Sequence, residues 1–159
     1  MKILVLLSAI LLFGYWVYLW IRFGIKDCFS RFSATHYPHW SYILFVSAMF
    51  LIPPMLELTD GKTLQFVAFL APVSLFLVAI TPRWATSNGQ YWLHNAGVIA
   101  AVLFSVIFSI LFRNLVWFLA GAAVLALIFG LIYKRSWMWF AELAIYSAMY
   151  AEITYLLFQ

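Results

Sequence analysis

Long apolar stretches, separated by short polar breaks, occupy almost the whole chain. Each apolar run approaches or exceeds the roughly 20 residues that a helix needs to cross the hydrocarbon core of a bilayer. The runs are Ile3–Phe23, His39–Leu58, Leu64–Ile80, Tyr91–Phe112, Leu115–Tyr133 and Trp137–Leu157. The pattern therefore predicts six membrane-crossing helices.

The breaks between these runs carry nearly all of the charge. Two of them are only "RN" and "KRS", so the helices predicted over 91–112, 115–133 and 137–157 are expected to be sequential antiparallel neighbours. Backbone polar groups inside a bilayer must be satisfied within the protein. We therefore expect residues 1–159 to form one all-α domain, a polytopic transmembrane helical bundle.

The composition strengthens the membrane interpretation. The chain is 67% hydrophobic and only 9% charged, whereas a soluble domain typically has about 25% charged residues. The first apolar run continues to Ile21 without a small-x-small cleavage site, which predicts a retained helix rather than a secretion signal. The basic residues form no block, which excludes nucleic acid as a partner. The expected location is the inner (cytoplasmic) membrane of a bacterium.

Lysine and arginine counts predict the orientation. Six helices place both termini on one side, here called the terminal side, and the other is the loop side. The terminal side has Lys2, Lys62 and Arg113. The loop side has Arg22, Lys26, Arg31, Arg83, Lys134 and Arg135. Because basic residues concentrate in cytoplasmic loops, the loop side is expected in the cytoplasm and both termini outside.

Polar side chains gather on the loop side from three separate parts of the chain. These are "CFSRFSATHYPHW", "YWLHNAG" and "WMWFAELA", which precede or open predicted helices. They bring Ser33, His36, His94 and Glu142 to one level of the membrane. An ionisable residue inside a membrane is costly and is a functional-site hypothesis by default. Glu142 is the strongest example, and its alternative role is a purely architectural bond.

Candidate roles follow from side-chain chemistry. Glu142 and Ser33 are the candidate catalytic residues, although Ser33 is also well placed to cap the following helix. The candidate binding residues are Tyr37, Arg83, Asn95 and Tyr146. The candidate metal ligands are His36, His94 and Glu142, which would leave one position of a zinc ion open for water. A hydrogen-bonded core histidine is the alternative for His94.

The helix predicted over 91–112 shows which of its faces points inward. Small and polar residues recur there at helical spacing, and residues at this spacing share one face. They are His94, Gly97, Ala101, Ser105 and Ser109. Small and polar faces pack against other helices, whereas large aliphatic faces meet lipid. This stripe is therefore expected to point into the bundle.

The helix predicted over 137–157 has two distinct faces. Its alanines form a ridge for close packing, at Ala141, Ala144, Ala148 and Ala151. A separate polar and aromatic row consists of Glu142, Tyr146 and Tyr150. Glu152 lies near the terminal side, where it is expected to bond a neighbouring helix or to reach the interface.

Several of these features resemble small bacterial membrane proteins of unknown function, which in turn are distantly similar to the CREST superfamily of alkaline ceramidases and progestin/adiponectin-type receptors. They are Ser33-Ala-Thr, Pro82, His94 followed by Gly97, and the acid Glu142 in the last helix. The resemblance implies a helical bundle whose zinc ion, held by three histidines, hydrolyses lipid amides. In this chain, Ser33, His36 and His94 are the residues that match the serine and histidine positions which the resemblance implies. The spacing of Ser33 and His36 departs from the family, and the paired histidines of its final helix are absent.

Three functions remain open at this point. The polar cluster could hold a membrane lipid, a membrane-protein partner or a second copy of the chain. A metal-dependent lipid hydrolase would instead use zinc to lower the pKa of a bound water, with Glu142 as the base. A small channel, holin-like pore or transporter subunit is the third alternative.

Overall fold

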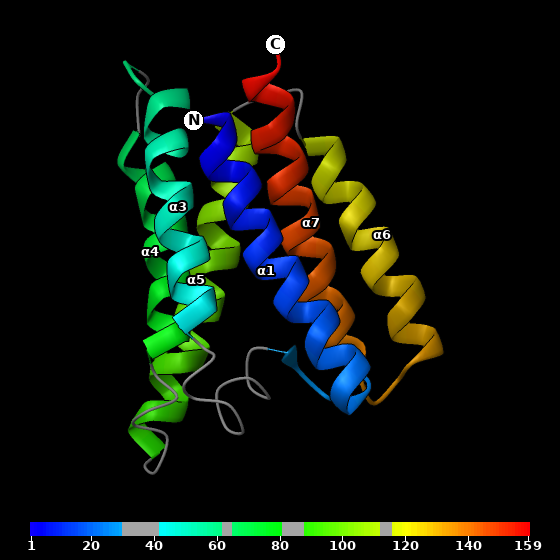
Figure 1. The fold of residues 1–159 in the computed structure, drawn as a ribbon. Coiled ribbons are helices and arrows are strands. Elements are labelled where there is room, and N and C mark those ends of the chain that lie inside the picture. The colour runs from blue at the N-terminus through cyan, green and yellow to red at the C-terminus, as the bar shows by residue number, and fades with distance from the viewer. Residues whose placement is uncertain (30–41, 62–64, 81–87, 112–115) are drawn as a thin grey trace.

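The computed structural model of the chain describes residues 1–29, 42–61, 65–80, 88–111 and 116–159. Within these ranges the chain forms six α-helices and no strand (Figure 1). They are α1 (Lys2–Phe23), α3 (Tyr42–Leu58), α4 (Gln65–Ile80), α5 (Asn88–Leu111), α6 (Val116–Ile132) and α7 (Trp137–Leu157). The predicted all-α class is confirmed.

The helix ends agree with the apolar runs to within a few residues. α7 has the predicted bounds, and α5 begins at Asn88, earlier than its apolar run. An apolar run marks the part of a helix that meets apolar surroundings, so it does not locate a polar first turn. The predicted starts at His39, Leu64 and Leu115 lie outside the described residues.

Two of the described helices are long and apolar enough to cross a membrane. They are Lys2–Phe23 and Trp92–Leu111. The segments Tyr42–Leu58, Gln65–Leu75 and Val116–Ile132 are apolar but shorter. Length and composition therefore support membrane association through two helices.

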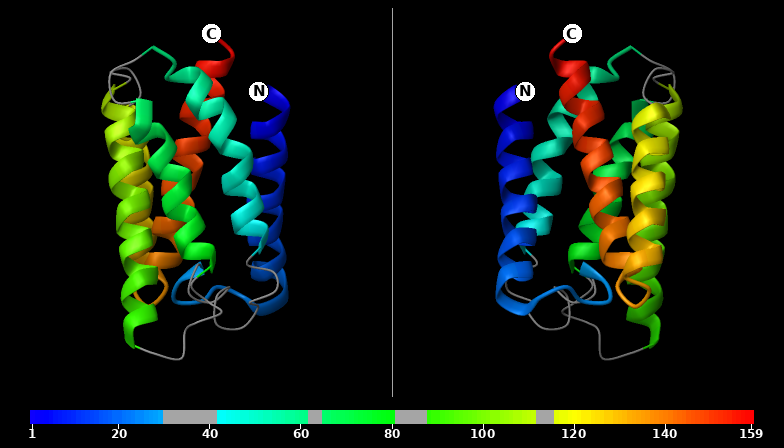
Figure 2. Two further views of the ribbon diagram at one scale, coloured as in Figure 1. Left: turned by 90° about the vertical axis from the view of Figure 1, so that its left-hand side faces the viewer. Right: turned by 90° about the vertical axis from the view of Figure 1, so that its right-hand side faces the viewer.

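The helices form one antiparallel bundle with both termini at the same end (Figure 1). The segments that follow α1 and precede α7 lie at the opposite end, as the turned views show (Figure 2). α1, α3, α4 and α5 pack in succession, while α7 contacts α1, α3, α5 and α6. α7 is therefore the helix that joins the parts of the bundle.

The position of α6 differs from the expectation. α5 and α6 are consecutive but touch only slightly, whereas α6 packs along α7. Ala122 of α6 meets Ala144 and Ala148 of α7, which confirms the alanine ridge as a packing surface. A short link brings two helix ends together but does not hold their axes together. The alanines of α6 and α7 allow the two helices to approach closely, so α6 packs on α7. The predicted packing of α6 against α5 is therefore wrong along most of the length of α6.

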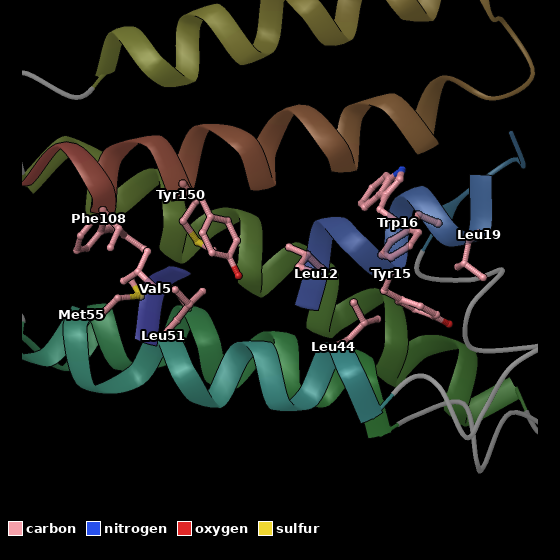
Figure 3. Close-up of a cluster of buried hydrophobic side chains, with 14 of the residues drawn as sticks. Val5, Leu12, Tyr15, Trp16, Leu19, Leu44, Leu51, Met55, Phe108 and Tyr150 are labelled. Atoms are coloured by element: carbon pink, nitrogen blue, oxygen red, sulfur yellow. The ribbon is translucent and has the colours of Figure 1, made fainter. Parts of the chain in front are cut away.

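A large apolar core joins α1, α3 and α7 (Figure 3). At its loop-side end, Trp16 of α1 stacks on Phe29 with ring centroids 3.7 Å apart. Trp139 of α7 meets both rings edge-on. Aromatic pairs in such geometries add stabilisation beyond the area they bury. This cluster ties the start of α7 to the end of α1.

A glycine turn delivers Phe29 to this cluster. Gly24 ends α1 with a φ of 72°, a left-handed conformation that a side chain disfavours. Its N–H donates to the Trp20 carbonyl at 2.8 Å. The chain then turns back beneath α1, so that Phe29 is fully buried.

Candidate functional site

The structure describes half of the predicted site residues. His94 and Asn95 lie near the start of α5 and are half-buried, while Glu142 of α7 is buried. Tyr146 lies one turn after Glu142 and is half-buried. The remaining predicted residues, Ser33, His36, Tyr37 and Arg83, lie outside the described residues, so their roles stay predictions.

Glu142 accepts hydrogen bonds from the segment that follows α1. The Phe29 backbone N–H donates to Oε2 at 2.8 Å, and the Cys28 thiol donates to Oε1 at 3.3 Å. A buried backbone N–H without a partner would cost free energy. Glu142 therefore fixes the turn that places Phe29 against Trp16. Glu142 therefore has the architectural role that was one of its two predicted alternatives. The predicted catalytic role stays a prediction.

The predicted metal site is not complete within the described residues. Among them, no group of three or more His, Cys, Asp or Glu side chains is placed to hold a metal ion. His36, the third predicted ligand, lies outside these ranges. Zinc binding by His36, His94 and Glu142 therefore stays a prediction.

The inward face of α5 is confirmed. Gly97, Ala101, Ser105 and Ser109 are buried, and His94 is half-buried. The large aliphatic residues on the other side of the helix are exposed, namely Ile99, Leu103 and Ile110. The small and polar stripe thus packs inside the bundle, as its spacing indicates.

The polar row of α7 continues toward the terminal side. Tyr150 reaches from α7 toward α1 and α3 (Figure 3). Its hydroxyl is hydrogen-bonded to the Ser8 hydroxyl, which itself donates to the Ser47 carbonyl at 2.6 Å. Because Ser8 has one hydrogen, the Tyr150 hydroxyl is the donor in the first bond. This buried network links three helices and has no feature that requires a ligand.

Glu152 lies at the terminal-side end of the seam between α5 and α7. The expectation that it bonds a neighbouring helix is confirmed, because its Oε2 lies 2.5 Å from the Ser109 hydroxyl of α5. The residue is only 1% exposed, and its Oε1 has no hydrogen-bond partner among the described residues. A buried, half-satisfied carboxyl group is unusual and requires an explanation.

A small cavity of about 70 Å³ lies in the same seam. Its polar lining consists of Glu142, Tyr146 and Ser105, and Met149 also contacts it. A buried water needs about 10–15 Å³ of such space and two to four polar partners. The cavity is therefore large enough for several waters between α5 and α7.

A much larger groove of about 570 Å³ lies on the other side of α7. Its walls are α1 and α6, and α7 forms its floor. Four tryptophans line it, namely Trp16, Trp20, Trp117 and Trp139. Among the described lining residues, Ser147 is the sole one that is neither apolar nor aromatic. The groove exists because α6 packs on α7 and diverges from α1. This arrangement of helices could not be predicted from the sequence.

Basic residues are close in the sequence to the residues that line the loop-side end of this groove. Ile25 and Tyr133 line that end, and Lys26 and Lys134 follow them directly in the sequence. Arg22, Lys134 and Arg135 are exposed. An apolar groove with a cationic end is suited to an amphipathic molecule whose polar end carries negative charge.

No family model, no curated protein and no solved structure matches the chain. The CREST-like resemblance therefore stays a prediction that rests on its short motifs.

Proposed function

We propose that the protein is a polytopic membrane protein of the bacterial inner (cytoplasmic) membrane that binds a lipid in the groove between α1 and α6. The acyl chain lies in the groove, and an anionic headgroup lies at its loop-side end. The observation that carries the proposal is the apolar groove of about 570 Å³, whose loop-side lining residues Ile25 and Tyr133 are followed directly in the sequence by Lys26 and Lys134.

The outer surface supports placement in a membrane. Large apolar side chains are exposed on every described helix, and Ile21 and Trp117 are each 81% exposed. Soluble monomers rarely expose contiguous apolar patches larger than a few hundred Å². Inside a bilayer these side chains contact hydrocarbon instead of water, so their exposure has no hydrophobic cost.

The shorter helices are compatible with this placement. α3 and α6 each have 17 residues, which corresponds to about 25 Å at 1.5 Å per residue, against a hydrocarbon core of about 30 Å. Local thinning of the bilayer accommodates such a mismatch at modest cost. The two acids of α7 are buried inside the bundle, so neither faces the lipid.

The size and chemistry of the groove favour an acyl chain over a partner helix. Ligand pockets commonly have volumes of about 300–1,000 Å³, and the groove falls in this range. A helix is about 10–12 Å across with its side chains, so one that crosses the bilayer needs several times this volume. An acyl chain has no polar groups, which matches the lining.

The charges at the groove's end favour an anionic headgroup. Arg22 of α1 and the pair Lys134 and Arg135 before α7 are exposed, and each is within three residues in the sequence of a residue that lines this end. A basic residue near an anionic lipid surface contributes about 1 kcal/mol of attraction. A phospholipid with one net negative charge satisfies both the apolar groove and its cationic end.

A variant that fills the groove tests this proposal. Gly121 lines the groove, and a Cβ added there meets no atom within 4 Å. Gly121→Leu therefore places a side chain in the space of the acyl chain without a clash. After purification in mild detergent, native mass spectrometry should find the wild type with bound phosphatidylglycerol in preference to phosphatidylcholine, and Gly121→Leu without it.

Gly14→Leu is the matched control, because Gly14 is also helical and open but does not line the groove. It should keep the lipid. Equal lipid retention by both variants would exclude the groove as the binding site. A dimer of protein chains in place of the lipid adduct would show that a second copy covers it.

A further inference from the structure

The wall of the groove between α1 and α6 contains a polar group that is not hydrogen-bonded within the described residues, the indole N–H of Trp16. We propose that Trp16 selects the lipid of the groove by donating this N–H to an ester carbonyl. The ligand is then a glycerophospholipid with ester-linked acyl chains, as opposed to an ether-linked one. The inference rests on the lipid binding proposed above and names the chemistry that the groove recognises.

The burial of Trp16 makes its free N–H costly. The side chain is only 2% exposed, and no described residue accepts a hydrogen bond from Nε1. An indole nitrogen can only donate, and a buried donor without an acceptor costs free energy. Buried polar groups that lack a partner are rare and require an explanation. An acceptor oxygen supplied by a ligand provides one.

The surrounding rings hold this N–H in one direction. Phe29 stacks on the Trp16 ring with centroids 3.7 Å apart. Trp139 and Tyr146 meet the same ring edge-on, at 5.5 and 6.1 Å. Ring faces are weak acceptors, so this packing orients the donor without satisfying it.

The N–H is directed toward the floor of the groove. Figure 3 shows the indole nitrogen of Trp16 on the edge of the ring that faces α7. α7 forms the floor of the groove, and both Trp16 and Trp139 line it. The donor is therefore presented on the side from which a ligand in the groove would approach.

The depth of Trp16 matches the ester level of a phospholipid. Trp139, which Trp16 contacts, is the third residue of α7, so it lies within about 5 Å of the loop-side start of that helix. Tryptophan is also enriched near the interface of a membrane. In a glycerophospholipid the ester carbonyls follow the phosphate after the short glycerol unit. A phosphate at the loop-side end of the groove therefore brings these carbonyls to the level of Trp16.

The lining of the groove changes in the same order as the parts of such a lipid. At the loop-side end, Ile25 and Tyr133 are each followed in the sequence by a lysine, which suits a phosphate. The donor of Trp16 comes next. Toward the terminal side the wall is apolar and includes Phe118 and Gly121 of α6, which suits an acyl chain. An ether-linked lipid fits the two outer regions but offers no carbonyl to Trp16.

The carbonyl oxygen reaches the N–H through a small change in the groove wall. Nε1 is covered by protein atoms, and a hydrogen bond requires nitrogen and oxygen about 2.9 Å apart. Phe140 and Leu143 line the same groove and are half-buried. The wall can yield at these partly exposed side chains, because rotamer changes are common when a ligand binds.

A comparison of ester- and ether-linked lipids tests the inference on the wild-type protein. The delipidated protein in mild detergent is titrated with diester and with diether phosphatidylglycerol, and native mass spectrometry measures both dissociation constants. The diester form should bind about ten-fold more tightly, because it satisfies a donor that is otherwise unpaired and buried. Equal binding of the two forms would overturn the inference and leave the lipid-binding groove in place. Absence of binding by either form would refute the proposed function, and this inference with it.

Three variants identify the donor. Trp16→Phe keeps an aromatic ring but removes the N–H, so it should bind both forms equally. Trp117→Phe is the matched control, because Trp117 also lines the groove but is 81% exposed. Ser147→Ala is a second control, since Ser147 lies in the groove near the middle of α7. Both controls should keep the preference for the diester form, and its survival in a folded Trp16→Phe, or its loss in Ser147→Ala, would overturn the inference.

An NMR measurement on the wild type does not depend on how well a variant folds. With isotope-labelled tryptophan, the indole N–H groups of the eight tryptophans give separate signals. One of them should move to higher proton frequency when diester phosphatidylglycerol is added, and the diether form should not produce this shift. Loss of that signal in Trp16→Phe assigns it. Identical indole spectra with the two lipids would contradict the proposed hydrogen bond.

Discussion

Glu142 shows how one residue can serve the fold at a place where the sequence suggests chemistry. Its carboxyl group accepts the Phe29 N–H and the Cys28 thiol, and the resulting turn seats Phe29 on Trp16. The sequence indicates a costly acid in an apolar helix. Its hydrogen-bond partners are more than a hundred positions away in the sequence, so no local sequence pattern predicts them.

Removal of this acceptor should loosen the turn. Glu142→Ala leaves the Phe29 N–H without a partner, and a buried unsatisfied donor costs about 1–3 kcal/mol of unfolding free energy. Thermal unfolding in detergent, followed by tryptophan fluorescence, measures the loss. Glu142→Gln keeps an acceptor oxygen and should lose less. Equal stability of Glu142→Ala and the wild type would show that the bond contributes nothing.

At the scale of elements, α4 and α5 pack closely through Gly97. A Cβ at this position would lie 3.2 Å from Leu77 Cβ and 3.3 Å from the Ser74 carbonyl oxygen. Close approach of this kind favours a glycine, because any larger residue obliges Leu77 or the α4 backbone to shift by a few tenths of an ångström. The inward stripe of α5 was predicted from spacing alone, and this contact explains one of its small members.

Gly97→Ala should therefore destabilise the helix pair. Overpacking of a close contact typically costs about 1–3 kcal/mol, which opposes the gain of up to about 1 kcal/mol that alanine brings to a helix interior. Gly14→Ala, where a Cβ meets nothing within 4 Å, should keep the gain. Thermal unfolding of the two variants measures the difference, and a stabilised Gly97→Ala would contradict the close packing.

At the scale of the whole molecule, both termini lie at one end of the bundle (Figure 1), as an even number of antiparallel helices requires. The excess of basic residues at the other end predicts that the loop side faces the cytoplasm. This orientation also places the cationic end of the groove toward the cytoplasmic leaflet, where anionic lipids attract basic residues.

Thiol labelling in intact cells measures the orientation. Asp27 and Asp60 are exposed at opposite ends of the bundle. In a Cys28→Ser background, Asp60→Cys should react with a membrane-impermeant maleimide from outside. Asp27→Cys should react only after permeabilisation. The reverse pattern would invert the orientation, and reaction of both from outside would contradict a single bundle across the membrane.

Much of the helical architecture could be predicted because its signals are local. The apolar runs locate the helices, and spacing places Ser105 inside and Leu103 outside. Spacing also separates the alanine ridge from the row of Glu142. These properties depend on the chain's own period of about 3.6 residues per turn, which is the same wherever the helix is placed.

The sequence by itself determined the helices, their inward faces and the burial cost of the acids of α7. Only the tertiary structure decided that α6 follows α7 and leaves α5, that a groove opens toward α1, and that Ser109 meets Glu152. The physical reason is that the period of apolar residues determines only which face of a single helix is buried. The choice of partner depends on close fit between surfaces far apart in the chain, and no stretch of sequence contains both.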